Sequence, residues 1–122
     1  MEDAVAIAKL QKYIQIPTVH PNIDYEPIRY LQLLAKDLDI PLQVYNYMKN
    51  RVAVFTWVGQ EPTVSSVLLN SHMDTVPDLW KYNPFEGKID DKGNIYGHGA
   101  RDCKSLGIMY LEAIRRLKKS GV

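Results

Sequence analysis

The chain has 122 residues, of which 46% are hydrophobic and 24% are charged, and its formal net charge is +1. These values are those of an ordinary globular domain and exclude an intrinsically disordered chain. A net charge this small offers no basic surface to a nucleic-acid backbone, so we expect no nucleic-acid partner. The single cysteine, Cys103, excludes an internal disulfide and a zinc site built from cysteines.

The N-terminal residues and the hydropathy of the chain bear on its cellular location. Acids at positions 2 and 3 and lysines at positions 9 and 12 interrupt the apolar core that a signal peptide needs. No stretch of the sequence approaches the ~20 apolar residues that span a bilayer. We therefore expect a cytosolic protein without a membrane partner.

Three segments show the three-to-four spacing of apolar residues that is typical of a helix with one buried face. The first begins at Asp3, which we expect to be its N-cap, and is ended by Pro17; the second covers residues 27–38. The third covers residues 104–119, with Glu112 on its solvated face. The three apolar stripes are Ala4, Ile7, Leu10 and Ile14; Ile28, Leu31, Leu34, Ala35 and Leu38; and Leu106, Met109, Ala113, Ile114 and Leu117.

Four shorter segments have the composition of β-strands, which favour β-branched and aromatic residues. They are residues 42–47, 52–58, 67–72 and 95–97. Lys49 and Asn50 fit a tight connection between the first two, and residues 90–94 form a turn before the fourth. The second and third segments are apolar at nearly every position, as in strands that are covered on both faces.

This order of elements predicts an α/β fold in which helices flank a mixed sheet. Gly121 follows the last helix in the usual C-terminal position, and the sequence ends one residue later. A helix of this kind normally leads into another strand in an α/β fold. We therefore expect residues 1–122 to be part of a truncated domain.

His72 and Asp74 form an H-x-D pair at the end of the third predicted strand. Residues two apart in extended backbone face the same way, and ligands of α/β sheets gather beyond the carboxyl ends of strands. A histidine that binds a metal ion usually donates its other ring N–H to a carboxylate. The alternative interpretation is a surface histidine beside a turn-forming aspartate.

The motif G-H-G-A-R-D-C-K, residues 97–104, places Asp102 at the start of the last helix after two glycines that allow close backbone packing. An aspartate at this position can simply be an N-cap. A carboxylate can also bridge the ions of a two-metal hydrolase, which lie ~3.5–4 Å apart. The sequence leaves both interpretations open.

Together these motifs resemble the M20 family of metallopeptidases and amidohydrolases. The matching blocks, in family order and with family-like spacing, are S-H-M-D-T-V-P (71–77), Trp80, N-P-F (83–85) and G-N-I-Y-G-H-G-A-R-D-C-K (93–104). Residues 16–21, 56–77 and 110–118 are similar to the aminoacylases of this family. The resemblance implies that residues 1–122 are the N-terminal part of a zinc-peptidase-like catalytic domain. The rest of that domain and a dimerisation domain would lie outside these residues.

The resemblance also implies a role for each matched residue. His72 would bind one zinc ion, Asp102 would bridge two zinc ions, and Asp74 would act as the catalytic carboxylate that orients His72. The peptide bond between Asp102 and Cys103 would be cis. The implied reaction is the zinc-dependent hydrolysis of N-acyl-L-amino acids to a free amino acid and a carboxylate, by a protein that is a homodimer at full length.

Several residues depart from the family pattern or leave alternatives open. His98, Asn83 and Cys103 stand where arginine, aspartate and methionine are common in the family. His98 is an alternative ligand because it lies four residues from Asp102. We expect His20 at the surface, with a role at the rim of the site as the alternative, and Cys103 as a small buried hydrophobe. The family's general-base glutamate lies downstream of these residues, so we expect residues 1–122 alone to be inactive. The rival functions are a dipeptidase or carboxypeptidase and a non-catalytic product.

Overall fold

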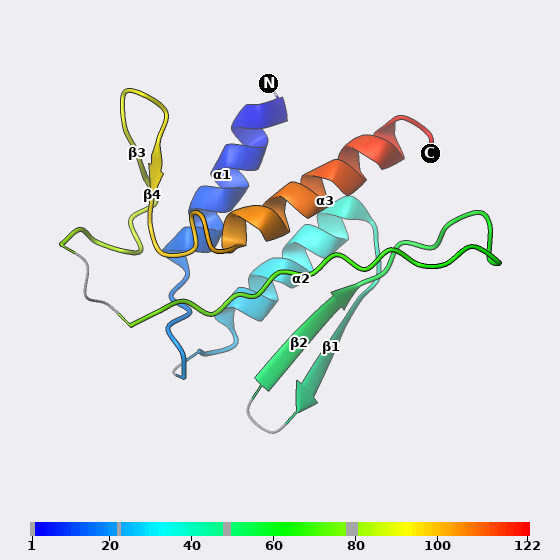
Figure 1. The fold of residues 1–122 in the computed structure, drawn as a ribbon, viewed down its shortest axis with the longest axis horizontal. Coiled ribbons are helices and arrows are strands. Elements are labelled where there is room, and N and C mark those ends of the chain that lie inside the picture. The colour runs from blue at the N-terminus through cyan, green and yellow to red at the C-terminus, as the bar shows by residue number, and fades with distance from the viewer. Residues whose placement is uncertain (1, 22, 48–49, 78–80) are drawn as a thin grey trace. The chain divides into compact units, whose positions relative to one another are not determined.

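A computed structural model describes residues 2–21, 23–47, 50–77 and 81–122 (Figure 1). The chain forms two compact units, one of Met1–Pro27 with Asn70–Val122 and one of Ile28–Leu69. The elements in chain order are α1 (Glu2–Gln15), α2 (Glu26–Leu38), β1 (Leu42–Tyr47), β2 (Asn50–Phe55), β3 (Lys88–Ile89), β4 (Ile95–Tyr96) and α3 (Lys104–Lys119). This combination of helices and strands confirms the predicted α/β class.

In the first unit, α1 and α3 pack side by side (Figure 1). Tyr13, Ile14 and Ile16 at the end of α1 are buried, as is Ile108 of α3. The predicted stripe of α1 is therefore buried only at its C-terminal end, and Ile7 is exposed. No helix among the residues that the structure describes is long and apolar enough to cross a membrane.

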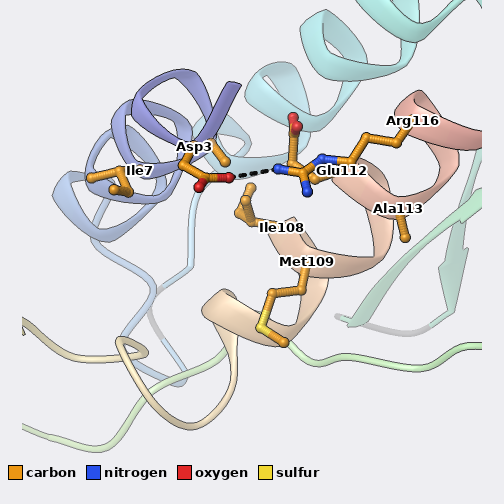
Figure 2. A pocket seen from close by; sticks show the side chains of 8 residues that line it. Asp3, Ile7, Ile108, Met109, Glu112, Ala113 and Arg116 are labelled. Carbon is orange, nitrogen blue, oxygen red and sulfur yellow. Dashed lines mark hydrogen bonds and ion pairs between the residues drawn. The ribbon is translucent and has the colours of Figure 1, made fainter. Parts of the chain in front are cut away.

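Asp3 lies inside α1 and is not its N-cap, so that prediction is wrong. Its carboxylate instead accepts a hydrogen bond from the Arg116 side chain of α3, at 2.7 Å. Figure 2 shows this ion pair beside a groove that is lined by Ile7 and by Ile108, Met109 and Ala113 of α3. A carboxylate near a helix N-terminus is favoured by the helix dipole, so Asp3 suits this position without capping the helix.

The buried face of α3 differs from the predicted one. Its buried residues are Lys104, Ile108 and Glu112, which repeat every four positions, whereas Met109 is 61% exposed. The predicted inner residues Ala113 and Leu117 are also exposed. Apolar spacing alone could not predict a buried face with charged side chains, because their burial depends on partners that are distant in the sequence.

Glu112 was expected on the solvated face and is buried. Its two carboxylate oxygens accept hydrogen bonds from Lys9 of α1 and from Arg115, each at 2.9 Å. Burial raises the pKa of the Glu112 carboxyl, but the hydrogen bonds and positive charges of Lys9 and Arg115 outweigh burial, so the pKa lies below its ordinary value. The carboxylate is therefore ionised and links α1 to α3.

β3 and β4 form an antiparallel hairpin with Ile89 opposite Ile95. The predicted turn at residues 90–94 is confirmed: the Asp90 carboxylate accepts hydrogen bonds from the backbone N–H groups of Lys92 and Asn94. It also accepts hydrogen bonds from the Asn94 amide and the Tyr96 hydroxyl. These bonds, led by the Asn94 side chain, lower the pKa of Asp90 to about 2. β3 was not predicted, and β4 is one residue shorter than the predicted strand at residues 95–97.

In the second unit, α2 has the predicted buried stripe and ends as the sequence indicates. Asp39 adopts a positive φ of 54°, and the N–H groups of Ile40 and Asp39 donate to the carbonyls of Ala35 and Lys36. This is the Schellman arrangement, which satisfies the last carbonyls of a helix. Gly121 ends α3 in the same way, with the N–H of Val122 donating to the Leu117 carbonyl.

β1 and β2 form an antiparallel pair with Leu42 opposite Phe55 (Figure 1). β1 has its predicted bounds, but β2 ends before residues 56–58. The expectation that this strand is covered on both faces is wrong, because Val52 and Val54 are exposed. Of the predicted connection at Lys49 and Asn50, Lys49 lies outside the described residues, whereas Asn50 is the first residue of β2 and pairs with Tyr47.

Residues 67–72 do not form the predicted third strand. Val67 and Leu68 are 84% and 87% exposed, so the apolar composition of this run does not reflect burial. A strand requires a hydrogen-bonding neighbour, and within the described ranges this run pairs with none. The strands therefore form two two-stranded antiparallel sheets where one mixed sheet was expected.

Candidate metal centre

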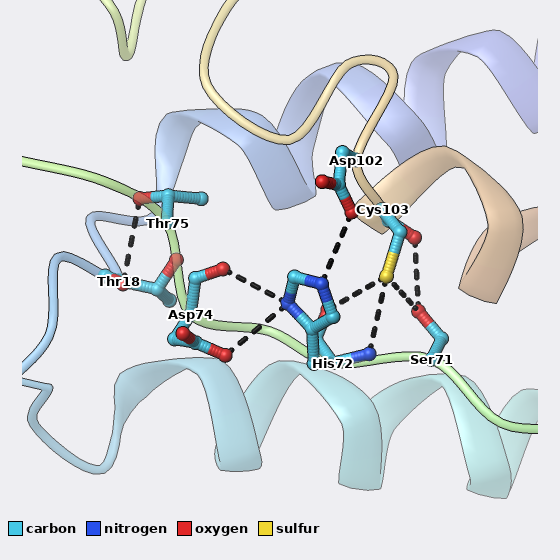
Figure 3. Close-up of polar contacts among 7 residues, drawn as sticks. All are labelled: Thr18, Ser71, His72, Asp74, Thr75, Asp102 and Cys103. Carbon is cyan, nitrogen blue, oxygen red and sulfur yellow. Dashed lines mark hydrogen bonds and ion pairs between the residues drawn. The ribbon is translucent and has the colours of Figure 1, made fainter.

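His72 lies between two carboxylates in the first unit (Figure 3). Its Nδ1 atom is 3.2 Å from Oδ1 of Asp74, and its Nε2 atom is 3.1 Å from Oδ1 of Asp102. All three side chains are exposed, so these contacts add little to the stability of the fold. The three residues thus lie close together, although His72 and Asp74 are not at the end of a buried strand and Asp102 lies in a turn.

The backbone around residues 71–75 explains why His72 and Asp74 share a side. Val19 and Thr75 form an isolated parallel bridge, and the N–H of Thr75 donates to the Thr18 carbonyl at 2.9 Å. This contact attaches the H-x-D segment to the residues that follow α1. Since the backbone is extended, the alternate side chains of His72 and Asp74 point the same way. Nδ1 of His72 also lies 3.1 Å from the Asp74 carbonyl oxygen.

Asp102 reaches His72 from the turn that precedes α3. The N-cap of α3 is Cys103, which makes no side-chain capping hydrogen bond, so the interpretation of Asp102 as an N-cap is wrong. The peptide bond between Asp102 and Cys103 is cis, as the family resemblance implies. The Asp102 carboxylate is therefore directed toward His72 and is not used to cap the helix.

The two glycines of the 97–104 motif allow this turn to pack closely. Gly99 has a φ of +88°, and a Cβ atom there would lie 2.8 Å from Cγ and Cδ of Lys104. A Cβ at Gly97 would overlap Cγ2 of Ile14 in α1. The predicted reason for these glycines, close packing, is confirmed. It holds the loop before Asp102 against the C-terminal end of α1.

Cys103 is closer to the site than the sequence indicated. Its Sγ atom accepts the backbone N–H of His72 at 3.2 Å and lies 3.3 Å from the Ser71 hydroxyl oxygen, which donates to the Cys103 carbonyl at 2.9 Å. Cys103 is at least partly buried, as predicted, but its thiol contacts polar groups and does not act only as a small hydrophobe. In the sequence, the only indication that Cys103 is near the site was its position directly after Asp102. No sequence feature indicated that Ser71 is near the site.

The donor set fits a cation. A neutral imidazole carries one N–H, so if Nδ1 donates to Asp74, then Nε2 presents a lone pair to the Asp102 carboxylate. Two acceptors face each other favourably only with a second proton or a metal ion between them. Zinc ligands at about 2.0–2.2 Å from one ion stand roughly 3–3.5 Å apart, which matches the separation of Nε2 and Oδ1. Ligand atoms of His72, Asp102 and Cys103 lie within 4.8 Å of one another.

The other residues considered from the sequence lie apart from this cluster. The ring of His98 packs edge-on against Phe85, with 6.1 Å between ring centroids. Among the described residues, one group of side chains could hold a metal ion, and His98 does not belong to it. His98 is therefore placed as a packing residue. His20 is exposed, as expected. Trp80, which belongs to the sequence motif, lies outside the described residues.

Comparison with known proteins connects this site to a family. Residues 68–122 match the model of peptidase family M20/M25/M40. The chain is 43% identical to aminoacylase-1 of Sus scrofa and 40% identical to aminoacylase-1 of Homo sapiens, over 95% and 98% of its residues. The chain is therefore similar to peptidase family M20/M25/M40. A putative carboxypeptidase of Saccharomyces cerevisiae is 30% identical over 93% of the chain.

These relatives are longer proteins. The chain spans 30% and 31% of the two aminoacylases and 18% of the putative carboxypeptidase. The family match begins just before His72 and includes Asp74, Asp102 and Cys103. The candidate metal centre thus lies wholly within the part of the chain that matches the family model.

Proposed function

We propose that this protein is a zinc-dependent hydrolase of N-acyl-L-amino acids, in which His72 and Asp102 bind metal. The observation that carries the proposal is the His72 ring held between the Asp74 and Asp102 carboxylates. Identity of about 40% to aminoacylase-1 over nearly the whole chain supports the substrate class. The products are a free amino acid and a carboxylate.

Each of the three residues has a distinct task in this proposal. Asp74 accepts the proton on Nδ1 of His72, which fixes the tautomer and leaves Nε2 as the ligand atom. Asp102 directs one carboxylate oxygen toward His72, and its carboxylate would hold metal together with His72. Zinc bound here supplies Lewis-acid polarisation of the amide carbonyl and a more acidic water. A complete site would hold two zinc ions, with Asp102 as a ligand to both.

The described residues supply only part of such a centre. His72 and Asp102 are two ligands, whereas catalytic zinc sites use about three protein ligands and structural sites use four. The thiol of Cys103 is near enough to be a further donor, but its Sγ is already engaged by the His72 N–H. We propose that residues 1–122 alone bind zinc weakly and hydrolyse no amide, and that a glutamate outside them is the general base. Homodimer formation and cytosolic location stay predictions.

A second candidate function is a different M20 activity. The 30% identity to a putative carboxypeptidase favours peptide hydrolysis as the alternative. The higher identity to the aminoacylases is our reason for ranking N-acyl amino acids first. A non-catalytic product remains the alternative from another class.

The test compares substrates with the protein expressed from its complete reading frame. Release of methionine from N-acetyl-methionine should exceed release from unmodified dipeptides, should cease after a chelator removes the metal, and should return with zinc. Faster dipeptide cleavage would assign the protein to the peptidase branch. Absence of zinc-dependent release from either substrate would support the non-catalytic product and refute the proposal.

A further inference from the structure

Lys104 is a buried cation beside the candidate metal centre that the proposed chemistry does not use. The residue is 1% exposed, and its Nζ atom donates to the carbonyls of Tyr13 and Ile16, each at 2.9 Å. Nζ also lies 4.9 Å from the centroid of the Tyr13 ring. Burial lowers the pKa of Lys104 to about 8, which still leaves the ammonium mostly charged at pH 7.

The two acceptors belong to the C-terminal end of α1. Carbonyls at such an end lack partners within the helix and carry the negative end of its dipole. A cation is favoured there, and a buried charge is tolerated only when it is hydrogen-bonded. Lys104 thus caps α1 from a distant part of the sequence. Both hydrogen bonds use Nζ, so the ammonium is held by backbone carbonyls and not by the metal ligands.

The same end of α1 is attached to the other half of the centre. Thr18 accepts the N–H of Thr75, three residues after His72, whereas Lys104 lies two residues after Asp102. Gly99 has no side chain, and the stem of Lys104 occupies the space that a Cβ would need. Residues 13–18 are therefore a common support for the segment with His72 and the turn with Asp102.

We propose that Lys104 is a positioning residue, which holds the Asp102 turn against the end of α1 and thereby sets the separation of Asp102 from His72. The inference rests on the proposed zinc site. It adds Lys104, which is not a ligand, to the residues that determine how tightly the site binds zinc. Loss of the ammonium leaves two buried carbonyls without this donor and releases the turn. Zinc affinity then falls although every ligand remains.

The experiment measures the zinc dissociation constant of the protein from its complete reading frame, by competition with a chromophoric chelator. Lys104→Met keeps the apolar stem and removes the charge. Lys9→Met is the matched control, because Lys9 also reaches between α1 and α3, donating to Glu112 at 2.9 Å two turns further along α3. Lys104→Met should weaken zinc binding about 10-fold or more, as is typical for residues behind metal ligands. Lys9→Met should lose stability and keep the wild-type zinc affinity.

Four outcomes overturn the inference, and they differ in whether the proposed function survives. Wild-type zinc affinity in folded Lys104→Met means that Lys104 serves stability alone, and the proposed function survives. Equal weakening in both lysine variants means that loss of stability, and not positioning, lowers the affinity. A wild-type protein whose zinc binding is absent or unaffected by His72→Ala refutes the proposed function as well. If Lys104→Met does not fold, Lys104→Gln replaces it, because the glutamine amide can still donate to one carbonyl. A zinc affinity of Lys104→Gln between that of the wild type and the loss expected for Lys104→Met supports the inference. A wild-type zinc affinity overturns it.

Discussion

Replacing Glu112 with glutamine tests whether the buried ion pair between α1 and α3 stabilises the first unit. The Glu112 side chain is 8% exposed, and its carboxylate accepts from Lys9 and Arg115, each at 2.9 Å. Glutamine has nearly the same shape but is neutral and turns one oxygen acceptor into a donor. The substitution therefore leaves two cations facing a side chain that cannot satisfy both.

The expected loss follows from how deeply the three groups are buried. Breaking a fully buried ion pair costs about 3–5 kcal/mol because it leaves an uncompensated charge. The Lys9 and Arg115 side chains are 17% and 24% exposed, so water reaches them in part and the cost is smaller. We expect Glu112→Gln to lower the free energy of unfolding by about 2–3 kcal/mol, between the buried and exposed limits.

The assay is urea denaturation with a matched exposed pair as control. Asp3 and Arg116 join the same two helices at 2.7 Å, with side chains 83% and 48% exposed. Asp3→Asn should cost no more than about 1 kcal/mol, because exposed pairs are screened by water. Equal losses in the two variants, at unchanged denaturant dependence, would show that burial does not set the strength of these pairs and refute the reasoning.

Three further predictions address pH, backbone and site. Because the pKa of Glu112 is lowered in the folded state, its contribution is present above the ordinary value of 4.5 and is lost as pH falls through the folded-state pKa. The stability difference between wild type and Glu112→Gln should therefore shrink below pH 4.5 in denaturation curves; a constant difference down to pH 2 would contradict it. Gly99→Ala should cost more than Gly93→Ala in the same assay. Both glycines have positive φ, which alone costs roughly 1–2 kcal/mol, but only a Cβ at Gly99 meets another side chain, that of Lys104. Asp74→Ala should reduce hydrolysis about 10–100-fold and lower zinc affinity less, because an orienting carboxylate acts through the ligand; equal losses in rate and affinity would make Asp74 a ligand.

Elements that depend on local sequence were predicted well. The spacing of apolar residues located all three helices to within one or two residues, and β1 has its predicted bounds. α2 ends at Leu38 as predicted, and the end of α3 at Gly121 followed from turn chemistry, which involves neighbours in the chain. The H-x-D spacing predicted that His72 and Asp74 point the same way, because alternation in extended backbone is also a local property.

Features that depend on distant partners were not predictable. Lys104 and Glu112 are buried because groups of α1, about 90–100 residues earlier, satisfy their charges, and nothing in the spacing of α3 reveals this. The apolar run at residues 67–72 was interpreted as a buried strand, but strand formation depends on a pairing neighbour and not on composition. Cys103 joined the site through contacts of its thiol with the backbone of His72, which no sequence pattern encodes.

The most direct test of the central claim combines zinc titration with hydrolysis in variants of the two proposed ligands. In the protein from its complete reading frame, His72→Ala and Asp102→Ala should each abolish tight zinc binding and the release of methionine from N-acetyl-methionine. His20→Ala, which removes an exposed histidine outside the cluster, should leave both unchanged. Zinc-dependent hydrolysis that persists in His72→Ala would contradict the assignment of this centre.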